Sequence, residues 1–383
     1  MHNHVHAHSR RDFFNRIFGS ALAGASIIEE AFLRATWARA QAPGASPNLF
    51  MIEKVTDGVY AALARPQALT NCNAAIFVNS RDVLVVDAHS KPSAAAALIA
   101  QIKKDITTKP VRYLVNSHFH WDHTQGDAAY KANGAMVDII ASDATKQLMT
   151  QLSRNRLKES LDSIPKQIDD VQARLVKATS DADKERYTDL IRQLKTYQTE
   201  MKNYTLELPT ITFAKSHVIK DTAGDLIIEF HGRAHTAGDI AVFSSQKHVV
   251  ASGDVIIGFL PNIADGYPRP WPATINSVGQ LAFDHIIPGH GPVQYGRGRM
   301  TQMRNYIEEL TGRVEEGKKA GKPLAELQKT LTMASIKSLQ ADGYGSYVAD
   351  NLKNFSVYLG QKTAVEDRLS ANVEAIYKNL DRA

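Results

Sequence analysis

Residues 117–127 place four metal-binding side chains within six positions, because His118, His120, Asp122 and His123 form the pattern His-x-His-x-Asp-His. Imidazole and carboxylate donors suit Zn, Fe or Mn, and the lack of thiolate argues against a structural zinc site of the cysteine type. A helix would scatter these side chains around its circumference, whereas a tight loop leaving a strand can direct them at one point. The preceding run 111–115, Val-Arg-Tyr-Leu-Val, predicts that strand.

Three later segments each place one further ligand type beside a glycine, just past an apolar run that predicts a strand. The ligand-type residues are His235 after the run 226–230, Asp254 after 248–251 and His290 after 283–287. Glycine lets the backbone turn sharply and approach a metal closely. A purely structural role for the whole set would require many desolvated polar groups to share a partner, so we expect a metal site.

This set of motifs resembles the metallo-β-lactamase superfamily, whose metal motifs all occur here in order between residues 50 and 295. The resemblance implies an α/β fold, an αββα sandwich of two mixed sheets with helices outside and the ligands on loops at one edge. It implies one metal bound by His118, His120 and His235, a second bound by Asp122, His123 and His290, and Asp254 bridging the two. The run 83–87 resembles the family's N-terminal strand with its structural aspartate, and Asp87 is expected to orient a ligand loop by hydrogen bonding.

The chemistry expected from this set is that of a dinuclear hydrolase with two zinc ions per chain, Fe or Mn being the alternatives. A metal-bridging hydroxide would attack an ester, thioester, lactone or similar bond. Asp122 and Asp254 are the predicted catalytic residues, which would take up or orient the proton of the metal-bound water.

Two other enzyme classes stay open as alternatives. Family β-lactamases mostly carry Cys or another residue at the position of Asp254, which argues against β-lactam hydrolysis, whereas export to the periplasm favours it. A mononuclear iron oxidoreductase of the persulfide dioxygenase type is disfavoured, because the residues for a second metal are all present. The complete set also argues against a metal-dependent binding protein without turnover.

The loop after Asp254 should border the substrate cleft. Tyr267, Arg269 and Trp271 are therefore candidate substrate contacts, although packing is slightly favoured for Trp271. His89 is expected at the surface, and His231 is expected to be a sheet residue. Cys72 is the one cysteine of the chain, so an intrachain disulfide is excluded, and it is expected to be buried and inert.

The composition is that of an ordinary globular protein, with 383 residues, 44% of them hydrophobic and 22% charged. The formal charge of +5 is mild, and Lys and Arg are interspersed with Asp and Glu. We therefore expect a small-molecule substrate and no nucleic-acid partner.

Residues 1–40 are predicted to be a twin-arginine export signal. Ser-Arg-Arg-Asp-Phe-Phe at 9–14 precedes an apolar stretch too short to span a bilayer, and Ala-Arg-Ala at 38–40 offers a cleavage site. The mature protein is then expected in a bacterial periplasm or outside the cell, without a stable membrane anchor. The alternative is a basic, disordered tail.

Two helical regions flank or interrupt the predicted catalytic domain, residues 41–298. Within it, residues 143–204 repeat apolar residues at spacings of three and four, which predicts an inserted antiparallel helical hairpin with a cap at Ser180 or Asp181. Pro165 is expected to kink or restart its first helix. Its role is either structural or that of a lid or homodimer contact beside the metal site. Residues 299–383 form a predicted C-terminal helical region.

Overall fold

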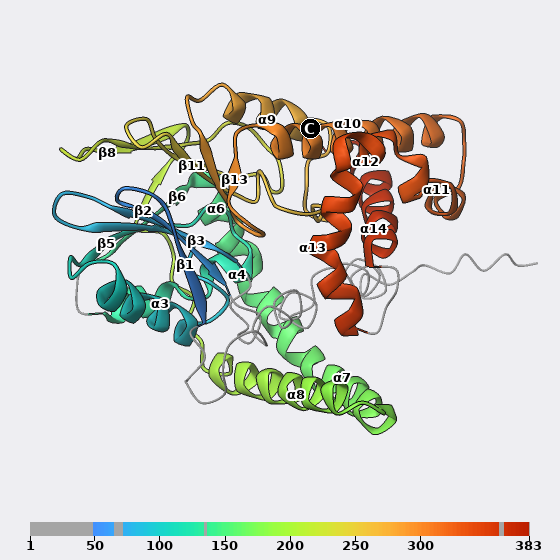
Figure 1. Ribbon diagram of the computed structural model, residues 1–383, viewed down its shortest axis with the longest axis horizontal. Helices are drawn as coiled ribbons and strands as arrows, with labels where there is room; N and C mark the ends of the chain where they lie inside the picture. The colour runs from blue at the N-terminus through green and yellow to red at the C-terminus, as the bar shows by residue number, and fades with distance from the viewer. Residues whose placement is uncertain (1–48, 65–71, 134–135, 360–363, 383) are drawn as a thin grey trace, which may run out of the picture.

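The computed structural model describes residues 49–64, 72–133, 136–359 and 364–382, so the predicted export signal lies outside the described residues. Two sheets make up the centre of the molecule (Figure 1). The first has seven strands in chain order: β1 (Phe50–Thr56), β2 (Val59–Ala64), β3 (Ala74–Val78), β4 (Val83–Val86), β5 (Val111–Val115), β6 (Asp138–Ser142) and β7 (Ile211–Phe213). The second follows the order β13 (Gln294–Tyr295), β12 (His285–Pro288), β11 (Val249–Gly253), β10 (Ala241–Ser244), β9 (Leu226–Glu229) and β8 (Ser216–Ile219).

Both sheets are mixed, and their parallel strands are the ones that lead to the metal motifs. β4, β5, β6 and β7 pair in parallel, as do β11 and β12 in the second sheet, whereas the other pairs are antiparallel. The carboxyl ends of parallel strands meet at one edge of a sheet. Asp87, the loop with His118, Asp254 and His290 therefore all follow strands that end at this edge.

Three apolar layers hold the fold together. Side chains of both sheets interdigitate in a central layer, with Phe77 and Val115 from the first sheet and Val242 and Ile287 from the second. The outer face of the first sheet is covered by α3 (Pro92–Asp105) and α5 (Asp127–Ala132). The outer face of the second sheet is covered by α9 (Trp271–Gly279) and α10 (Gly298–Lys319), as Figure 1 shows. The predicted αββα sandwich is confirmed.

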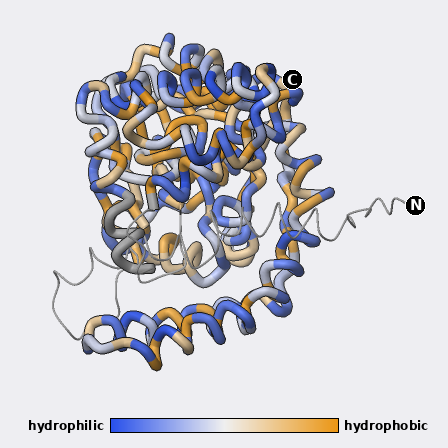
Figure 2. The backbone as a smooth tube through the Cα atoms, turned by 90° about the vertical axis from the view of Figure 1, so that its right-hand side faces the viewer, coloured by the Kyte–Doolittle hydropathy of each residue, from blue (hydrophilic) through white to orange (hydrophobic). Residues whose placement is uncertain are grey.

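The predicted hairpin is present and projects from the body of the molecule (Figure 2). After β6 the chain forms α6 (Asp143–Leu148), a π-helical turn (Met149–Ser153) and α7 (Arg154–Lys177), and α8 (Asp181–Met201) returns. Apolar side chains of α7 and α8 pack together along the predicted seam. Ser180 caps α8 by accepting a bond from the backbone N–H of Asp183, as predicted.

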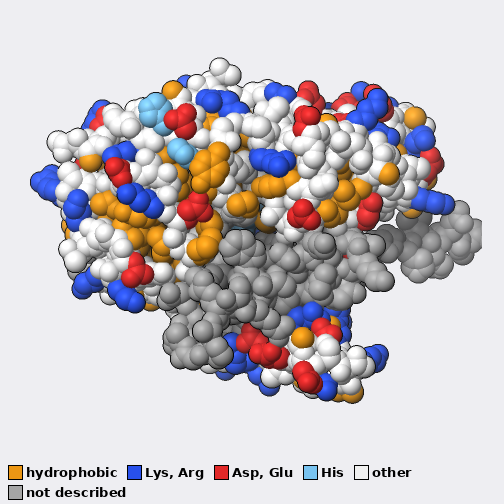
Figure 3. Space-filling view, in the orientation of Figure 1, with side chains coloured by type: hydrophobic (Ala, Val, Ile, Leu, Met, Phe, Trp, Pro, Cys, Tyr) orange, Lys and Arg blue, Asp and Glu red, His pale blue; other side chains and the backbone are white. Residues whose placement is uncertain are grey.

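The helix does not restart at Pro165, because α7 runs through this residue without interruption. Pro165 is exposed, so the carbonyl that loses its helical partner can be hydrated. The neighbouring Ile164 and Ile168 pack against α8, which stabilises the helix on both sides of the proline. The hairpin surface visible in Figure 3 carries both Lys or Arg and Asp or Glu side chains, as expected for a solvated face.

The C-terminal helices share the core of the second sheet. They are α11 (Leu324–Thr330), α12 (Lys337–Gln340), α13 (Tyr344–Leu359) and α14 (Ala364–Asn379), with short 3-10 turns at Met333–Ser335 and Ala341–Gly343. Leu369, Val373 and Ile376 of α14 pack in the same apolar layer as α9 and α10. Within the described residues, no helix combines the length and apolar character needed to cross a membrane.

Candidate metal centre

The His-x-His-x-Asp-His motif lies where β5 gives way to the short helix α4 (Trp121–Thr124). His118 and His120 are in the extended loop, and His120 is the residue that precedes the first helical turn, with φ −65° and ψ 149°. Asp122 and His123 lie in that first turn. The change from extended to helical backbone brings the four side chains to one side of the loop, which a regular helix would not do.

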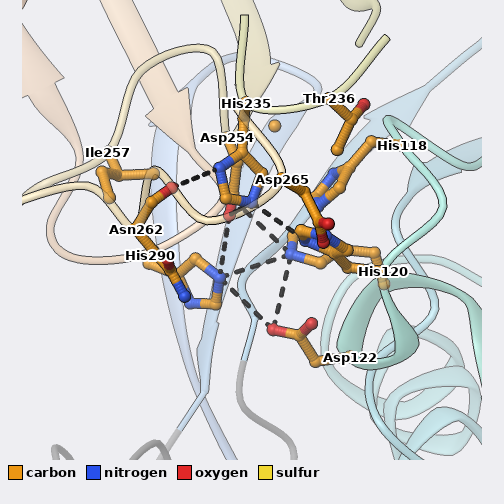
Figure 4. A network of polar contacts seen from close by, with 12 residues as sticks. His118, His120, Asp122, His235, Thr236, Asp254, Ile257, Asn262, Asp265 and His290 are labelled. Atoms are coloured by element: carbon orange, nitrogen blue, oxygen red, sulfur yellow. Dashed lines mark hydrogen bonds and ion pairs between the residues drawn. The ribbon is translucent and has the colours of Figure 1, made fainter. Parts of the chain in front are cut away.

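The structure brings together all seven residues that the sequence predicts as metal ligands. Three groups have ligand atoms within 4.8 Å of one another: His118 with His120 and His235, Asp122 with His123 and His290, and His118 with His123 and Asp254. The first two groups are the two predicted ligand sets. The third joins them, because it takes one histidine from each. Figure 4 shows six of them converging on one point: His118, His120, Asp122, His235, Asp254 and His290.

Asp254 lies at the centre of this cluster. Its Oδ2 atom is 3.4 Å from Nε2 of His235 and 3.3 Å from Nε2 of His290, and its Oδ1 atom is 3.6 Å from Nε2 of His123. The carboxylate thus contacts one histidine of the first predicted set and two of the second. A bridging ligand requires this position; the bridging role itself stays a prediction.

Outer partners fix which ring nitrogen of each histidine faces the cluster. Nδ1 of His123 donates to Oδ2 of Asp87 at 2.8 Å, and Nδ1 of His235 donates to the carbonyl oxygen of Asn262 at 3.0 Å. A carboxylate and a carbonyl only accept, so each ring keeps a lone pair on Nε2 once it is neutral.

His120 and His118 follow the same pattern. Nε2 of His120 donates to Oδ2 of Asp265 at 2.8 Å, which leaves the lone pair of Nδ1 facing Nε2 of His235 at 2.9 Å. Nδ1 of His118 lies 3.0 Å from the Ser117 hydroxyl, and that hydroxyl donates to Asp87, so the His118 ring is the donor. Nε2 of His118 is buried and has no hydrogen-bond partner among the described residues.

These inward lone pairs fit divalent cations. Two imidazole lone pairs that face each other at hydrogen-bond distance repel unless a cation lies between them, and a buried, unpartnered ring nitrogen is costly. The donor set of imidazole nitrogen and carboxylate oxygen suits zinc, with outer partners that orient the rings as in metal sites generally.

Burial and mutual proximity set the charges of the cluster. Burial, helped by the neighbouring imidazoles, lowers the pKa of His118 well below its ordinary value and that of His235 to about 3. Burial by itself would raise the pKa of Asp254, but the imidazoles of His290 and His123 hold it well below its ordinary range. Burial would lower the pKa of His123, but the carboxylate of Asp87 above all holds it well above the usual value, so a cation at His123 must displace a proton.

Asp87 has the contacts that its predicted orienting role requires. Its Oδ1 accepts from the backbone N–H of Ser117 at 2.8 Å, and its Oδ2 accepts from the Ser117 hydroxyl and from His123. The backbone of Asp87 is in the left-handed region, with φ 69°, which turns the chain directly after β4. One carboxylate therefore ties the first sheet to the loop with His118 and to the helix with His123.

Four further residues support the site and were missed by the sequence analysis. Asn73 donates from Nδ2 to the carbonyl oxygens of Pro288 and Gly291, on either side of His290, at 2.9 and 2.8 Å. Asn262 and Asp265 orient His235 and His120, and Arg156 of the hairpin binds Asp265. None of them belongs to a motif that spacing reveals.

The three candidate substrate contacts have different environments. Trp271 is fully buried, donates from its indole nitrogen to the carbonyl oxygen of Val255 at 3.0 Å and belongs to the core, so a substrate contact for it is wrong. The exposed Arg269 pairs with Glu315 of α10 at 3.0 Å. The ring of Tyr267 lies under the guanidinium of Arg233, 5.3 Å from its centre.

Three further side chains from the sequence analysis, His89, Cys72 and His231, lie within the described residues. His89 is fully buried, so the expectation of a surface position is wrong; its backbone has φ 66°, and Nδ1 lies 3.0 Å from the carbonyl oxygen of Cys72. Cys72 is buried as expected, and burial raises the pKa of its thiol to about 12, which keeps it protonated. His231 lies beyond the end of β9, so the expectation of a sheet residue is wrong, and its Nδ1 lies 3.1 Å from the Ser277 hydroxyl oxygen.

A cavity of about 280 Å³ lies between the ligand loop and the two ends of the hairpin, near the start of α7 and just after α8, and His120 forms part of its wall. The surface of the cavity is mostly apolar, although polar and charged residues also line it. The rest of the wall is formed by Phe119, Trp121, Thr124, Gln125, Ser153, Arg154, Arg156, Leu157, Tyr204, Thr205 and Leu206.

Residues 68–290 match the model of the metallo-beta-lactamase superfamily. Similar solved structures include a metallo-beta-lactamase from Pontibacter korlensis (17% identity, TM-score 0.49, covering 68% of this chain and 99% of the other). The metallo-beta-lactamase FIM-1 from Pseudomonas aeruginosa has 19% identity and a TM-score of 0.47, covering 69% of this chain and 98% of its own. One from Hirschia baltica has 18% identity and a TM-score of 0.46, covering 67% and 97%. The match over more than half of the chain, with the ligand cluster inside it, means that this protein belongs to the metallo-β-lactamase superfamily and is a metal-dependent hydrolase.

Proposed function

We propose that the chain is a dinuclear zinc hydrolase that cleaves an ester, thioester, lactone or similar bond. The observation that carries the proposal is the set of inward lone pairs of His118, His120, His123 and His235, with Asp254 between the two groups. Bound zinc would supply Lewis-acid polarisation of the substrate oxygen and a water activated at neutral pH.

The residues of the chain would divide the remaining tasks. Asp87 and Asn262 hold His123 and His235 in the orientation for binding, and burial keeps bulk water from the cluster. Asp122 and Asp254, both ionised in this setting, would orient or accept the proton of the attacking water, since each has an oxygen within 3.3 Å of Nε2 of His290.

The substrate group away from the scissile bond would occupy the cavity beside His120. Its aromatic and aliphatic wall, with Phe119, Trp121 and Leu206, suits an apolar group of modest size. Replacing the exposed Thr205 by Trp would fill part of this space. We expect Thr205→Trp to raise KM for bulky esters more than for acetyl esters and to leave zinc content unchanged.

Metal content tests the function first. The mature protein, purified from its own host without added metal, is analysed by elemental mass spectrometry and assayed on ester, thioester, lactone, β-lactam and phosphodiester substrates. We expect two zinc ions per chain, and in Asp254→Ala a joint loss of one metal and of turnover. One iron per chain, or full turnover in Asp254→Ala, would contradict the proposal. Preferential cleavage of β-lactams would show that the proposed substrate class is wrong and that the proposed metal chemistry still holds.

The proposal includes export by the twin-arginine route, which rests on the sequence of residues 9–40. Replacing Arg10 and Arg11 together by Lys keeps the charge and removes the arginine pair. Cell fractionation should then find the variant in the cytoplasm and the unchanged protein in the periplasm or medium. Identical distribution of the two would exclude this route.

A further inference from the structure

The inserted hairpin reaches the metal centre through one ion pair. Arg156, in the first turn of α7, binds Asp265 in a bidentate manner, with Nη1 2.7 Å from Oδ2 and Nη2 2.9 Å from Oδ1. Both side chains are about three-quarters buried, with 26% and 27% of their surface exposed. The guanidinium also lies over the ring of Phe119, 4.8 Å from its centre, so Arg156 contacts the ligand loop as well.

The carboxylate that Arg156 binds is the one that orients His120. Oδ2 of Asp265 accepts from Nη1 of Arg156 and from Nε2 of His120, at 2.7 and 2.8 Å. A bidentate guanidinium fixes the plane of a carboxylate, which a single contact does not. The position of Oδ2, and with it the rotation of the His120 ring, therefore depends on an arginine 36 positions further along the chain.

The loop that carries Asp265 is also held from its other side. Asn379 of α14 donates to the carbonyl oxygen of Ala264 at 2.9 Å, and Asn372 contacts the backbone of Pro261 and Ile263. The backbone is thus fixed by the C-terminal helix, while the side chain of Asp265 is fixed by the hairpin. The visible arrangement in Figure 4 places Asp265 directly beside His120.

We propose that Arg156 is a positioning residue of the metal centre, which holds Nδ1 of His120 toward His235 by fixing the carboxylate of Asp265. The inserted hairpin then contributes a residue that orients a metal-site histidine, a role different from that of a lid or a packing element. This inference rests on the proposed role of His120 as a metal ligand.

The test compares zinc affinity in three single variants, measured by competition with a chelating dye. Arg156→Gln removes the bidentate guanidinium, Arg156→Lys keeps the positive charge without the bidentate geometry, and Arg154→Gln is the matched control. Arg154 lies two positions away on the same helix, is exposed and lines the same cavity, without a contact to Asp265. We expect Arg156→Gln to weaken zinc binding about 10- to 100-fold, Arg156→Lys to weaken it less, and Arg154→Gln to leave it unchanged.

A variant pair separates positioning from a merely structural salt bridge. If Arg156 acts through Asp265, Arg156→Gln should add little to the loss of zinc affinity already caused by Asp265→Asn. Urea unfolding of the metal-free proteins shows whether the variants remain folded, and the effect on zinc should exceed any effect on this stability.

Two results overturn the inference, and they differ from each other. Zinc affinity of Arg156→Gln within twofold of the unchanged protein, or additive losses in the pair, would refute the positioning role while leaving the metal site intact. An unchanged protein that binds no zinc would refute the proposed function itself, and the inference with it.

Discussion

A Cβ atom on Gly289 would lie 2.0 Å from Oδ1 of Asp254. It would also lie 3.0 Å from the backbone of Gly253 and 3.1 Å from the ring of His123. The backbone N–H of Gly289 donates to the carbonyl oxygen of Gly253 at 2.8 Å, so the two loops approach as closely as backbones can. The glycine before His290 is therefore required by the neighbouring ligand Asp254.

Gly289→Ala should consequently displace Asp254 and abolish ordered metal binding. We expect turnover to fall by about 100-fold or more, because displacements of about 1 Å in a catalytic site have effects of that size. Zinc content and kcat measure the loss. The matched control is Gly312→Ala in α10, where an added Cβ meets nothing within 4 Å and should stabilise the helix by about 0.5–1 kcal/mol. Normal zinc content in Gly289→Ala would show that the loops can separate without harm.

Asp87→Asn tests the orientation of His123. The amide can still accept from the backbone N–H of Ser117, but its NH₂ group would replace the oxygen that accepts from Nδ1 of His123. Two donors would then face each other, which favours the ring tautomer that cannot bind metal through Nε2. We expect zinc affinity to fall about 10- to 100-fold, measured by chelator competition.

The exposed Asp284 provides the control for this change, since Asp284→Asn alters the same charge away from the site. Equal zinc affinity in both variants would show that Asp87 does not orient His123 for metal binding.

Asn372→Leu should destabilise the whole protein. Its side chain is buried, donates to the carbonyl oxygen of Pro261 and to the hydroxyl of Tyr306 at 2.9 Å each, and accepts from the N–H of Ile263. Leucine would leave these groups buried without partners, at about 1–3 kcal/mol for each group left unsatisfied. Urea unfolding measures the change, and Asn155→Ala on the exposed face of α7 should stay within about 0.5 kcal/mol of the unchanged protein. A similar small change in Asn372→Leu would mean that water replaces the lost bonds.

Asp239 gives the metal-free protein a pH-dependent stability. Burial raises the pKa of this carboxyl to about 8, although the hydrogen bonds from Thr236 oppose the shift. Between its unfolded value of 3.8 and about 8 the native state binds more protons than the unfolded state, so the free energy of unfolding falls as the pH rises through this window. Asp239→Asn removes the titrating carboxyl and should flatten the fall, since its amide oxygen can still accept from the backbone N–H of Thr236 and its NH₂ group can donate to the Thr236 hydroxyl oxygen.

Urea unfolding of both metal-free proteins at pH 5 and pH 7.5 checks this expectation. The difference between the two proteins isolates the contribution of Asp239 from that of other carboxyls such as Asp127. An identical pH dependence in both would show that Asp239 is already ionised in the native state.

The sequence by itself determined the seven residues of the candidate metal cluster and the elements that precede them. The runs before Asp87, His118, Asp254 and His290 are short, apolar and β-branched, and each forms the expected strand. A strand that is buried on both faces of a sheet needs apolar side chains at consecutive positions, so a continuous apolar run predicts it. The hairpin was predictable for the same reason, since its apolar residues recur at the helical period and face one another.

Only the tertiary structure decided what surrounds the ligands. Asp265 meets His120 across 145 positions, Asn73 clamps the turn of His290 across 215 or more, and Arg156 reaches Asp265 across 109. These partners are single polar residues in segments without periodicity, so no local pattern distinguishes them from residues at the surface. The continuous helix through Pro165 and the burial of Trp271 and His89 were likewise decided by packing against other elements, which overrides local preference. Local sequence thus specified which residues form the cluster, and contacts between distant segments specified how each side chain is oriented.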